Sequence, residues 1–224
     1  MKKLVIFGTS SFAKQMHYYF SSTADYHILG FALDREYIVE DNFLGLPVYS
    51  TEDLVALTKD ENVRCFLALG YKNMRAREYK FNQLKSRGVN FVSYISPHAI
   101  CQIDLTNIGE NSIILANATI EPFSVIGDNV FIWTGVTICH DVVVDDHSFI
   151  AAGVVIGGHS VIGENCFLGF NSTVSSGVVL ASETLLAANS FIQMDTKNAA
   201  FYAGSPATQK NTHLDKGIRI DVIQ

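Results

Sequence analysis

From Ile108 onward every sixth residue is Ile, Leu or Val, and the period continues without a miss through fifteen repeats to Ile192. A small or β-branched residue stands two positions before each of these aliphatics. The period matches neither an α-helix, at about 3.6 residues, nor a strand, at about 2, so it must be an internal repeat. An ordinary β-sandwich does not keep its strands in register over so many units. The repeat therefore predicts a left-handed parallel β-helix, in which each hexad forms one short strand and one corner.

Three hexads complete one coil of such a helix, so the fifteen hexads predict five coils stacked into a triangular prism. If the coils are spaced like neighbouring strands, at about 4.8 Å, the prism is roughly 24 Å tall. The aliphatic side chains are expected to point inward and form its core. Glycines follow five of them, and we expect these at corners that need unusual backbone angles: Gly109, Gly127, Gly157, Gly163 and Gly169.

Residues 1–96 show a different pattern, in which strands alternate with helices. Strands are expected at residues 4–7, 26–33, 46–49, 65–69 and 90–95, and helices at 12–20, after an N-cap at Thr51 and at 74–87. Such alternation is typical of a parallel sheet with helices on its faces. The chain is thus expected to contain an α/β Rossmann-like domain over residues 1–96, the β-helix over 97–207 and a tail over 208–224. This tail either packs locally or extends to a neighbour.

Composition limits the possible partners and the location. The formal net charge of −6 and the lack of a basic cluster argue against a nucleic acid partner. No apolar run approaches the roughly 20 residues of a membrane span, and the Met-Lys-Lys start leads directly into a strand rather than a signal peptide. We therefore expect a cytoplasmic protein. Its four cysteines lack CxxC spacing and are expected to be reduced.

Three loops follow strands of the predicted parallel sheet, at Gly8, Asp34 and Gly70. Ligands of such sheets bind beyond the carboxyl ends of the strands. Gly8 begins part of a dinucleotide fingerprint, with Ser10 and Ala13 in place of the other glycines. Backbone amides and the Ser10 hydroxyl can hold a phosphate there, and Asp34 can accept a hydrogen bond from a ribose or a base. The missing glycines favour a smaller nucleotide group over a redox dinucleotide, and a plain packing turn is the alternative.

Several short motifs follow one another in a fixed order along the chain. They are Ile6-Phe7-Gly8-Thr9-Ser10, Leu69-Gly70-Tyr71 with Arg75, Ile95-Ser96-Pro97-His98-Ala99, Cys139-His140-Asp141, Gly157-Gly158, the segment 162–169 and the segment 202–207. In this order they resemble the bacterial sugar acyltransferases typified by the sialic acid O-acetyltransferase and the nucleotide-linked amino-sugar N-acetyltransferases. The resemblance implies acetyl-CoA as co-substrate, no metal, and a homotrimer with each active site between neighbouring β-helices.

His140 and Asp141 are the expected catalytic pair. His140 follows the inward Ile138 by two positions, so it belongs to a corner or an outer wall rather than the core. Its imidazole can remove a proton from an attacking amine or hydroxyl, and Asp141 can fix the tautomer and stabilise the imidazolium. The pair resembles the catalytic histidine and following acid of the family. An exposed polar turn is the alternative.

Gly158 lies eighteen residues, or one coil, beyond His140, so the two residues are expected to stack in one corner. Without a side chain, Gly158 lets a thioester approach, and its N–H can donate to the oxyanion formed there. A purely conformational corner glycine is the alternative. The expected mechanism is direct attack of the substrate amine on the thioester, with His140 as base and no acyl-enzyme.

The resemblance also implies further site residues. Close relatives carry a second histidine nine residues beyond the catalytic one, in contact with the acetyl donor, but Phe149 occupies that position here and His147 lies two residues away. Where some relatives have a polar residue seven positions before the catalytic histidine, this chain has Trp133. Gly204 and Pro206 lie in a segment similar to the exit loop that borders CoA. The nucleotide-sugar residues implied are Gly8, Ser10, Asp34, Gly70 and Arg75.

These expectations favour N-acetylation of a nucleotide-linked 4-amino-4,6-dideoxy sugar for surface glycan (O-antigen) biosynthesis. O-acetylation of sialic acid or another sugar is the alternative. Two other classes remain open, a zinc lyase of the carbonic anhydrase type and a non-catalytic trimeric scaffold. A zinc lyase needs three histidines at one metal, whereas His140, His147 and His159 are expected on successive walls that do not converge.

Overall fold

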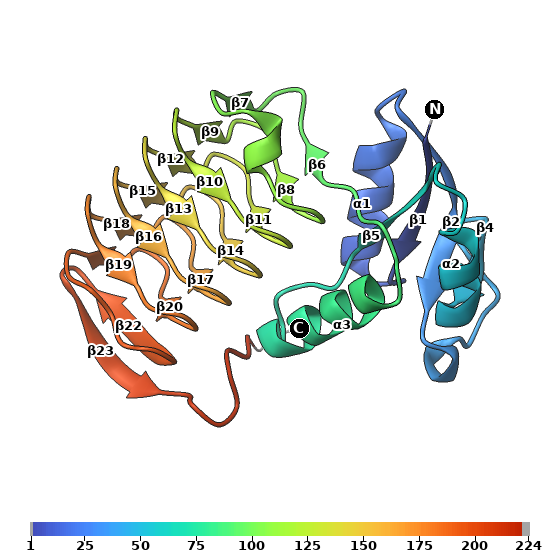
Figure 1. The fold of residues 1–224 in the computed structure, drawn as a ribbon. Helices are drawn as coiled ribbons and strands as arrows, with labels where there is room; N and C mark the ends of the chain where they lie inside the picture. The colour runs from blue at the N-terminus through green and yellow to red at the C-terminus, as the bar shows by residue number, and fades with distance from the viewer. Residues whose placement is uncertain (1, 221–224) are drawn as a thin grey trace. The chain divides into compact units, whose positions relative to one another are not determined.

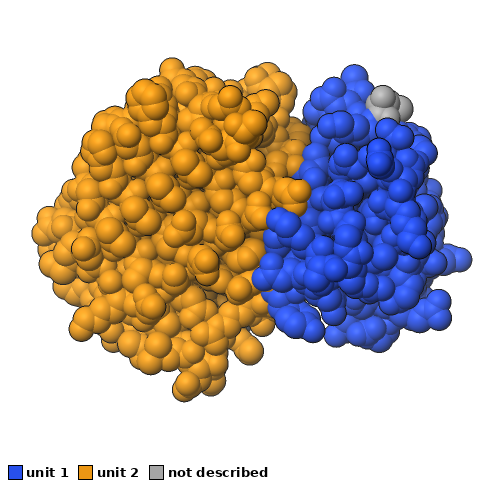
Figure 2. Space-filling view, viewed as in Figure 1, with its two compact units in different colours: residues 1–70, 79–92 blue, residues 71–78, 93–224 orange. Residues whose placement is uncertain are grey.

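The structure, a computed structural model, describes residues 2–220. These residues divide into two compact units, residues 2–70 with 79–92 (unit 1) and residues 71–78 with 93–220 (unit 2) (Figure 2). The division falls after residue 92, where the sequence pattern places it after residue 96. It also assigns a short segment, residues 71–78, to the β-helix unit.

Unit 1 has one five-stranded sheet in the order β3-β4-β2-β1-β5. All neighbours pair in parallel except β3 and β4, which form an antiparallel edge. The strands are β1 (Lys2–Phe7), β2 (Tyr26–Leu33), β3 (Asn42–Phe43), β4 (Leu46–Ser50) and β5 (Val63–Leu67). The helices are α1 (Ser11–Ser21), α2 (Thr51–Leu57), α3 (Met74–Ser86), of which residues 74–78 belong to unit 2, and the 3-10 helix η1 (Arg35–Tyr37). This is the Rossmann-like α/β arrangement that the alternating pattern predicts.

The start of α2 differs from the prediction by one residue. Ser50, not Thr51, is the N-cap, and its hydroxyl accepts a hydrogen bond from the Asp53 amide at 3.1 Å. The Asp53 carboxylate in turn accepts from the Ser50 amide at 3.1 Å, which completes a capping box. Thr51 is therefore the first helical residue, and its hydroxyl is free to donate to Asp34 at 2.7 Å.

The segment 90–95 does not form the last strand of this sheet, contrary to the prediction. Phe91 makes one isolated bridge to Cys65, and only Tyr94 and Ile95 form a strand, β6 (Tyr94–Ile95), which pairs with a β-helix strand of unit 2. Val89 and Phe91 are buried against the core of unit 1. In the sequence, a run of apolar residues such as these looks like a strand. In the structure, their side chains instead anchor the connection between the units.

Unit 2 is a parallel β-helix with three walls (Figure 1). The aromatic wall consists of β6, β8 (Ile113–Ile114), β11 (Phe131–Ile132), β14 (Phe149–Ile150), β17 (Phe167–Leu168) and β20 (Leu185–Leu186), and it continues into the hairpin of β22 (Ala200–Gly204) and β23 (Ala207–Thr212). The valine wall consists of β10 (Val125–Ile126), β13 (Val143–Val144), β16 (Val161–Ile162) and β19 (Val179–Leu180). The threonine wall consists of β7 (Ile100–Cys101), β9 (Thr119–Ile120), β12 (Thr137–Ile138), β15 (Val155–Ile156), β18 (Thr173–Val174) and β21 (Phe191–Ile192). A 3-10 helix, η2 (Leu105–Asn107), precedes the first hexad.

The register of the walls confirms that one coil takes eighteen residues. Phe131 pairs with Phe149, Thr137 with Val155, and so on through all three walls. From Ile114 to Ile192 each inward aliphatic is at most 1 % exposed, so these side chains form the single core of the prism. The short strands β6 and β7 extend two of the walls before the first hexad.

The corner glycines have a different role from the one predicted. The left-handed backbone angles fall two positions after them, for example at Asn111 and Asn129, where φ is 55°. The glycines instead allow two coils to approach closely: a Cβ at Gly163 would lie 2.7 Å from the backbone nitrogen of Ser182. Glycine is thus needed at these positions because the next coil lies too close for a Cβ, and not because of the backbone dihedral angles.

The tail packs on unit 2 as far as residue 220. The His213 ring lies 2.8 Å from the Glu183 carbonyl oxygen, Ile218 is buried, and Arg219 forms an isolated bridge with Asn73. Of the two alternatives for the tail, the described residues therefore support local packing. Residues 221–224 lie outside the described part of the chain.

Candidate active site

His140 and Asp141 lie in the corner between the threonine wall and the valine wall, where β12 leads into β13. One coil later, Gly158 and His159 occupy the equivalent positions between β15 and β16, and the His159 amide donates to the His140 carbonyl at 3.1 Å. Asp141 and His159 both have left-handed angles, with φ of 58° and 59°. These four residues are called the His140 corner below.

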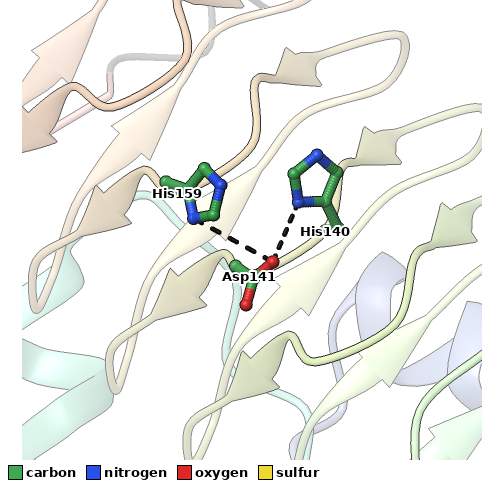
Figure 3. Close-up of side chains that lie close together, drawn as sticks. All are labelled: His140, Asp141 and His159. Carbon is green, nitrogen blue, oxygen red and sulfur yellow. Dashed lines mark hydrogen bonds and ion pairs between the residues drawn. The ribbon is translucent and has the colours of Figure 1, made fainter.

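The His140 ring is held by a hydrogen bond between its Nδ1 and the Asp141 Oδ2 at 2.9 Å (Figure 3). Its backbone amide donates to the Glu121 Oε2 at 2.8 Å. The His140 side chain is 51 % exposed, so a second molecule can reach it. Because Asp141 orients Nδ1 as the donor, Nε2 is the nitrogen that can take up a proton. The predicted pair thus has the geometry of a general base with an orienting carboxylate.

Gly158 stacks beside this ring, as the coil count predicts. A Cβ at Gly158 would lie 2.9 Å from the His140 Cε1 and 3.0 Å from its Nε2. The missing side chain therefore leaves free the space next to the nitrogen that can act as base. The Gly158 amide, predicted to bind an oxyanion, acts to lower the pKa of the neighbouring Cys139 thiol, and its role toward an oxyanion stays a prediction.

Cys139 is a neighbour that the sequence reasoning did not place in the site. Partial burial, with the nearby Glu121 charge, raises the pKa of its thiol above the ordinary value. A protonated thiol is a poor nucleophile. The corner therefore favours direct attack by the substrate over transfer through a cysteine.

His159 is the residue that the sequence reasoning missed. Its Nδ1 lies 3.9 Å from the Asp141 Oδ2, and its ring meets the His140 ring edge-on with 4.9 Å between centroids. The expectation that His140 and His159 do not converge is therefore wrong. The two residues are nineteen positions apart in the sequence, so His159 stacks on Asp141, one position beyond His140. Counting coils from Asp141 as well as from His140 would have found this contact.

His147 does not join the cluster, as predicted. It lies in the next corner, between the valine and aromatic walls, and is 5 % exposed. Its Nδ1 is 3.0 Å from the Asn129 Nδ2, and its carbonyl accepts a hydrogen bond from Arg77.

Phe149 lies on the aromatic wall, away from the His140 corner of its own chain. It is 2 % exposed and stacks on Phe167 at 5.3 Å, with an angle of 8° between the rings. Tyr71 covers it at 4.5 Å and Trp133 packs against it at 5.1 Å. A role for Phe149 toward acetyl-CoA remains a prediction, but the ring presents almost no surface to a ligand.

Gly204 and Pro206 form the exposed turn between β22 and β23. Gly204 has a φ of 109°, which favours glycine, and its amide donates to the Ser190 hydroxyl at 3.0 Å. This turn has the exposure that a CoA-bordering loop needs, and that role stays a prediction.

In unit 1 the three predicted loops lie at one edge of the sheet. Gly8 follows β1 and has a φ of 125°, and a Cβ there would lie 3.0 Å from the carbonyl oxygen of Ala68, which follows β5. Ser10 is the N-cap of α1 and accepts a hydrogen bond from the Ala13 amide at 3.5 Å. Its hydroxyl thus belongs to a helix N-terminus, where a phosphate can bind. Gly70 has open space around it, with nothing within 4 Å of an added Cβ.

Asp34, at the end of β2, is already paired within unit 1. The Lys80 Nζ lies 2.7 Å from its carboxylate, and the Thr51 hydroxyl donates to it at 2.7 Å. Partial burial acts to raise the pKa of Asp34, but the hydrogen bonds from Lys80 and Thr51 outweigh it and hold the pKa below the ordinary value. Asp34 is therefore a carboxylate at neutral pH, as a ribose-binding residue would be.

A pocket of about 210 Å³ opens at the same edge of the sheet. Thr9 and Leu33, which follow or end the central strands, form one side of it. The remaining lining residues are Tyr37, Val39, Glu40, Asn42, Phe43 and Val48. None of these residues was singled out from the sequence as a site residue. They come from η1, β3, β4 and the loop between η1 and β3.

Arg75 has a structural role within unit 2. Its guanidinium donates to the Glu183 Oε2 at 2.7 Å and to the Leu214 carbonyl at 2.9 Å. The other predicted nucleotide-sugar residues belong to unit 1. These pairings leave Arg75 less able to bind a phosphate than its place in the sequence motif suggests.

None of the helices within residues 2–220 has the length and the apolar character needed to cross a membrane.

Family models match most of the chain. The PglD N-terminal domain matches residues 3–84, the bacterial transferase hexapeptide model matches residues 106–139 and 123–158, and the hexapeptide repeat of succinyl-transferase matches residues 160–193. A search of curated protein sequences found no match.

Solved structures share the whole fold. The acetyltransferase domain of PglB from Neisseria gonorrhoeae FA1090 is 24 % identical, with a TM-score of 0.77 over 94 % of this chain and 100 % of that chain. A mutant of GDP-perosamine N-acetyl transferase from Caulobacter crescentus, in complex with CoA and GDP-perosamine, is 23 % identical, with a TM-score of 0.82 over 94 % and 98 %. WeeI from Acinetobacter baumannii AYE is 15 % identical, with a TM-score of 0.58 over 94 % and 100 %.

These likenesses confirm the predicted architecture, an α/β N-terminal domain followed by a left-handed parallel β-helix. The repeat models that match the β-helix are those of bacterial transferases and of succinyl-transferase. The chain therefore belongs to the bacterial hexapeptide-repeat acyltransferases and carries a PglD-type domain in front of its β-helix.

Proposed function

We propose that this protein is an acetyl-CoA-dependent N-acetyltransferase that acts on a nucleotide-linked amino sugar. The observation that carries the proposal is the His140 corner. The Nδ1 of His140 is bonded to Asp141, and its Nε2 faces the space that a side chain at Gly158 would fill. A base with a free nitrogen on an exposed side chain, beside open space, is what an acyl transfer to an amine requires.

The reaction needs one proton acceptor and one proton donor. The substrate amine attacks the thioester carbonyl, and the His140 Nε2 takes the proton that the nitrogen loses. Asp141 stabilises the imidazolium through Nδ1. The carbon–sulfur bond breaks, the imidazolium returns the proton to the CoA sulfur, and the amide is released. The protonated Cys139 takes no part in this sequence.

The nucleotide end of the substrate is assigned to unit 1. The Ser10 end of α1, the Asp34 carboxylate and the pocket beside Thr9 lie at the carboxyl edge of the parallel sheet, where such domains bind nucleotides. The solved relatives that bind GDP-perosamine support a nucleotide-linked amino sugar as the substrate class.

Assembly as a homotrimer, with each active site between copies, is part of the proposal. The outward residues of the valine wall support it, because Val125, Val143, Val161 and Val179 form an apolar ladder beside the His140 corner. Val125 and Val179 are 42 % and 43 % exposed in the single chain. An apolar face of this kind is more stable when a second surface covers it.

The test is acetyl-CoA turnover against GDP-, UDP- and dTDP-linked 4-amino sugars and against free sialic acid. We expect turnover of at least one nucleotide-linked amino sugar and a fall of about 10² to 10⁴ in kcat for His140→Ala, with the melting temperature and assembly unchanged. Turnover of sialic acid alone would replace N-acetylation by O-acetylation. Turnover that does not depend on His140, or no turnover of any acceptor, would contradict the proposal.

A further inference from the structure

We propose that His140, Asp141 and His159 form a binding site for one divalent transition-metal ion, and that an ion bound there blocks acyl transfer. The block, but not the binding, rests on the proposed function. One ligand atom from each of the three side chains lies within 4.8 Å of the other two (Figure 3). Within residues 2–220 this is the one group of His, Cys, Asp or Glu side chains with such spacing.

The donor set suits a transition metal rather than Mg²⁺ or Ca²⁺. Two imidazole nitrogens and one carboxylate oxygen are ligands that Zn²⁺, Co²⁺, Ni²⁺ and Cu²⁺ accept. Around a tetrahedral ion with bonds of about 2.0 to 2.1 Å, ligand atoms are roughly 3.3 Å apart. The distances from the Asp141 Oδ2 to the Nδ1 atoms of His140 and His159 are 2.9 Å and 3.9 Å, which lie on either side of that value.

The backbone holds the three donors on neighbouring coils. The His159 amide donates to the His140 carbonyl at 3.1 Å, and the His140 amide donates to Glu121 at 2.8 Å. The adjustment needed to bind an ion therefore falls on the His159 side chain. That side chain is 68 % exposed, so its ring can rotate toward Asp141 without displacing a core residue.

An ion at this site prevents His140 from acting as a base, because it fixes the tautomer in which Nε2 carries the proton. Bound to the Nδ1 of His140, it replaces the proton now shared with Asp141, and the neutral ring then carries its proton on Nε2. A protonated Nε2 cannot accept the proton of an attacking amine. The same ion withdraws the Asp141 carboxylate from the imidazolium that it would stabilise.

The binding test uses the full chain without an affinity tag and without CoA, because both bind metals. Co²⁺ is titrated while the visible absorption of bound Co²⁺ is recorded, and Zn²⁺ is measured by equilibrium dialysis. We expect one ion per chain and a loss of affinity of about tenfold or more in His159→Asn. His98→Asn, an exposed histidine outside the cluster, and Cys139→Ser, which removes the nearest thiol, are the controls and are expected to bind like the wild type.

Equal affinity in the wild type and His159→Asn, or loss of binding in Cys139→Ser alone, would overturn the site. The block is tested by the ratio of rates with and without Zn²⁺, followed through the acetylated amine rather than the CoA thiol. The block is supported if this rate ratio is several-fold closer to one in His159→Asn than in the wild type. It is refuted if the ratio is the same in both proteins. If His140→Ala leaves acyl transfer intact, the proposed function fails while the binding data stand on their own.

Discussion

His140 meets Gly158, and Asp141 meets His159, because one coil takes eighteen residues. A residue is therefore brought beside another that is far away in the sequence, and the choice of side chain at both positions defines the site. At Gly158 the choice is no side chain at all, since a Cβ would lie 3.0 Å from the His140 Nε2. Gly158, the smallest residue in the corner, thus decides how freely another molecule can approach the His140 Nε2.

Gly158→Ala tests this point. The added methyl group forces the His140 ring away from its position, and displacement of a catalytic group by about 1 Å can lower the rate by about 10²-fold. We expect a fall of roughly 10 to 100-fold in kcat for the most active acceptor. Steady-state kinetics measure the change, and circular dichroism checks the fold.

Gly135→Ala is the matched control. Gly135 is also a corner glycine, but nothing lies within 4 Å of a Cβ added there. Its φ of 69° makes the alanine variant slightly less stable, and its kcat is expected to stay near that of the wild type. Equal loss of activity in both variants would mean that any corner substitution disturbs the β-helix, and not that Gly158 leaves room for the base.

At the scale of an element, the corner between the valine and aromatic walls forms a ladder of polar side chains. The Asn111 Nδ2 donates to the Asn129 Oδ1 at 2.9 Å, and the Asn129 Nδ2 lies 3.0 Å from the His147 Nδ1. Arg77, from the first turns of α3, donates to the His147 carbonyl and lies 4.3 Å above the Phe131 ring. Burial lowers the pKa of Arg77 to about 9. The start of α3 is therefore held by a guanidinium group that is shielded from water.

His147 makes this ladder sensitive to acid. Burial, and then the positive charge of Arg77, lower the pKa of His147 below its ordinary value of 6.5. The unfolded chain therefore binds a proton that the folded chain resists. The folding free energy that depends on neutral His147 is fully present above about pH 6.5 and decreases as the pH falls toward the folded pKa, by at most about 1.4 kcal/mol per pH unit.

His147→Asn is expected to remove this acid dependence. Asparagine occupies the equivalent positions 111, 129 and 165 with left-handed angles, so it fits the ladder. Between about pH 7.5 and about pH 5.5 the unfolding free energy should fall less in the variant than in the wild type. Urea unfolding at several pH values measures the difference. An identical pH dependence in both proteins would show that His147 does not titrate as described.

At the scale of the whole molecule, the walls of the prism differ in what they present outward. The aromatic wall is covered within unit 2, for example by Tyr71 over Phe149. The valine wall presents an apolar ladder, and the threonine wall is more polar, with Thr119, Thr137 and Thr173 among its outward residues. The valine wall is therefore the face that gains most from contact with another copy.

Val161→Lys is expected to weaken the proposed trimer. The side chain points outward from the middle of the valine wall, so the lysine is tolerated in the single chain but leaves a charge in the interface. Light scattering after size exclusion should show a shift toward monomer and a parallel loss of acetyl transfer. Thr173→Lys, at an outward position of the threonine wall, is the control and should keep the assembly. The opposite pattern would move the interface to the threonine wall.

The hexad period was enough to predict the β-helix, its coil length and the stacking of Gly158 on His140, because a repeat locks each position to a fixed place in every coil. It failed for the corner glycines, since contacts between coils depend on the backbone of the next coil and not on local angles. In unit 1 the strands follow from apolar runs, but residues 90–95 imitate a strand because a buried connection has the same apolar character.

The sequence by itself therefore determined the two folds and the family and predicted the pairing of His140 with Asp141, because these depend on periodic burial and on neighbours along the chain. Only the tertiary structure placed His159 against Asp141, covered Phe149 with Tyr71 and paired Arg75 with Glu183. Contacts of this kind depend on side-chain direction and on which wall a segment packs against. A one-dimensional period does not contain that information.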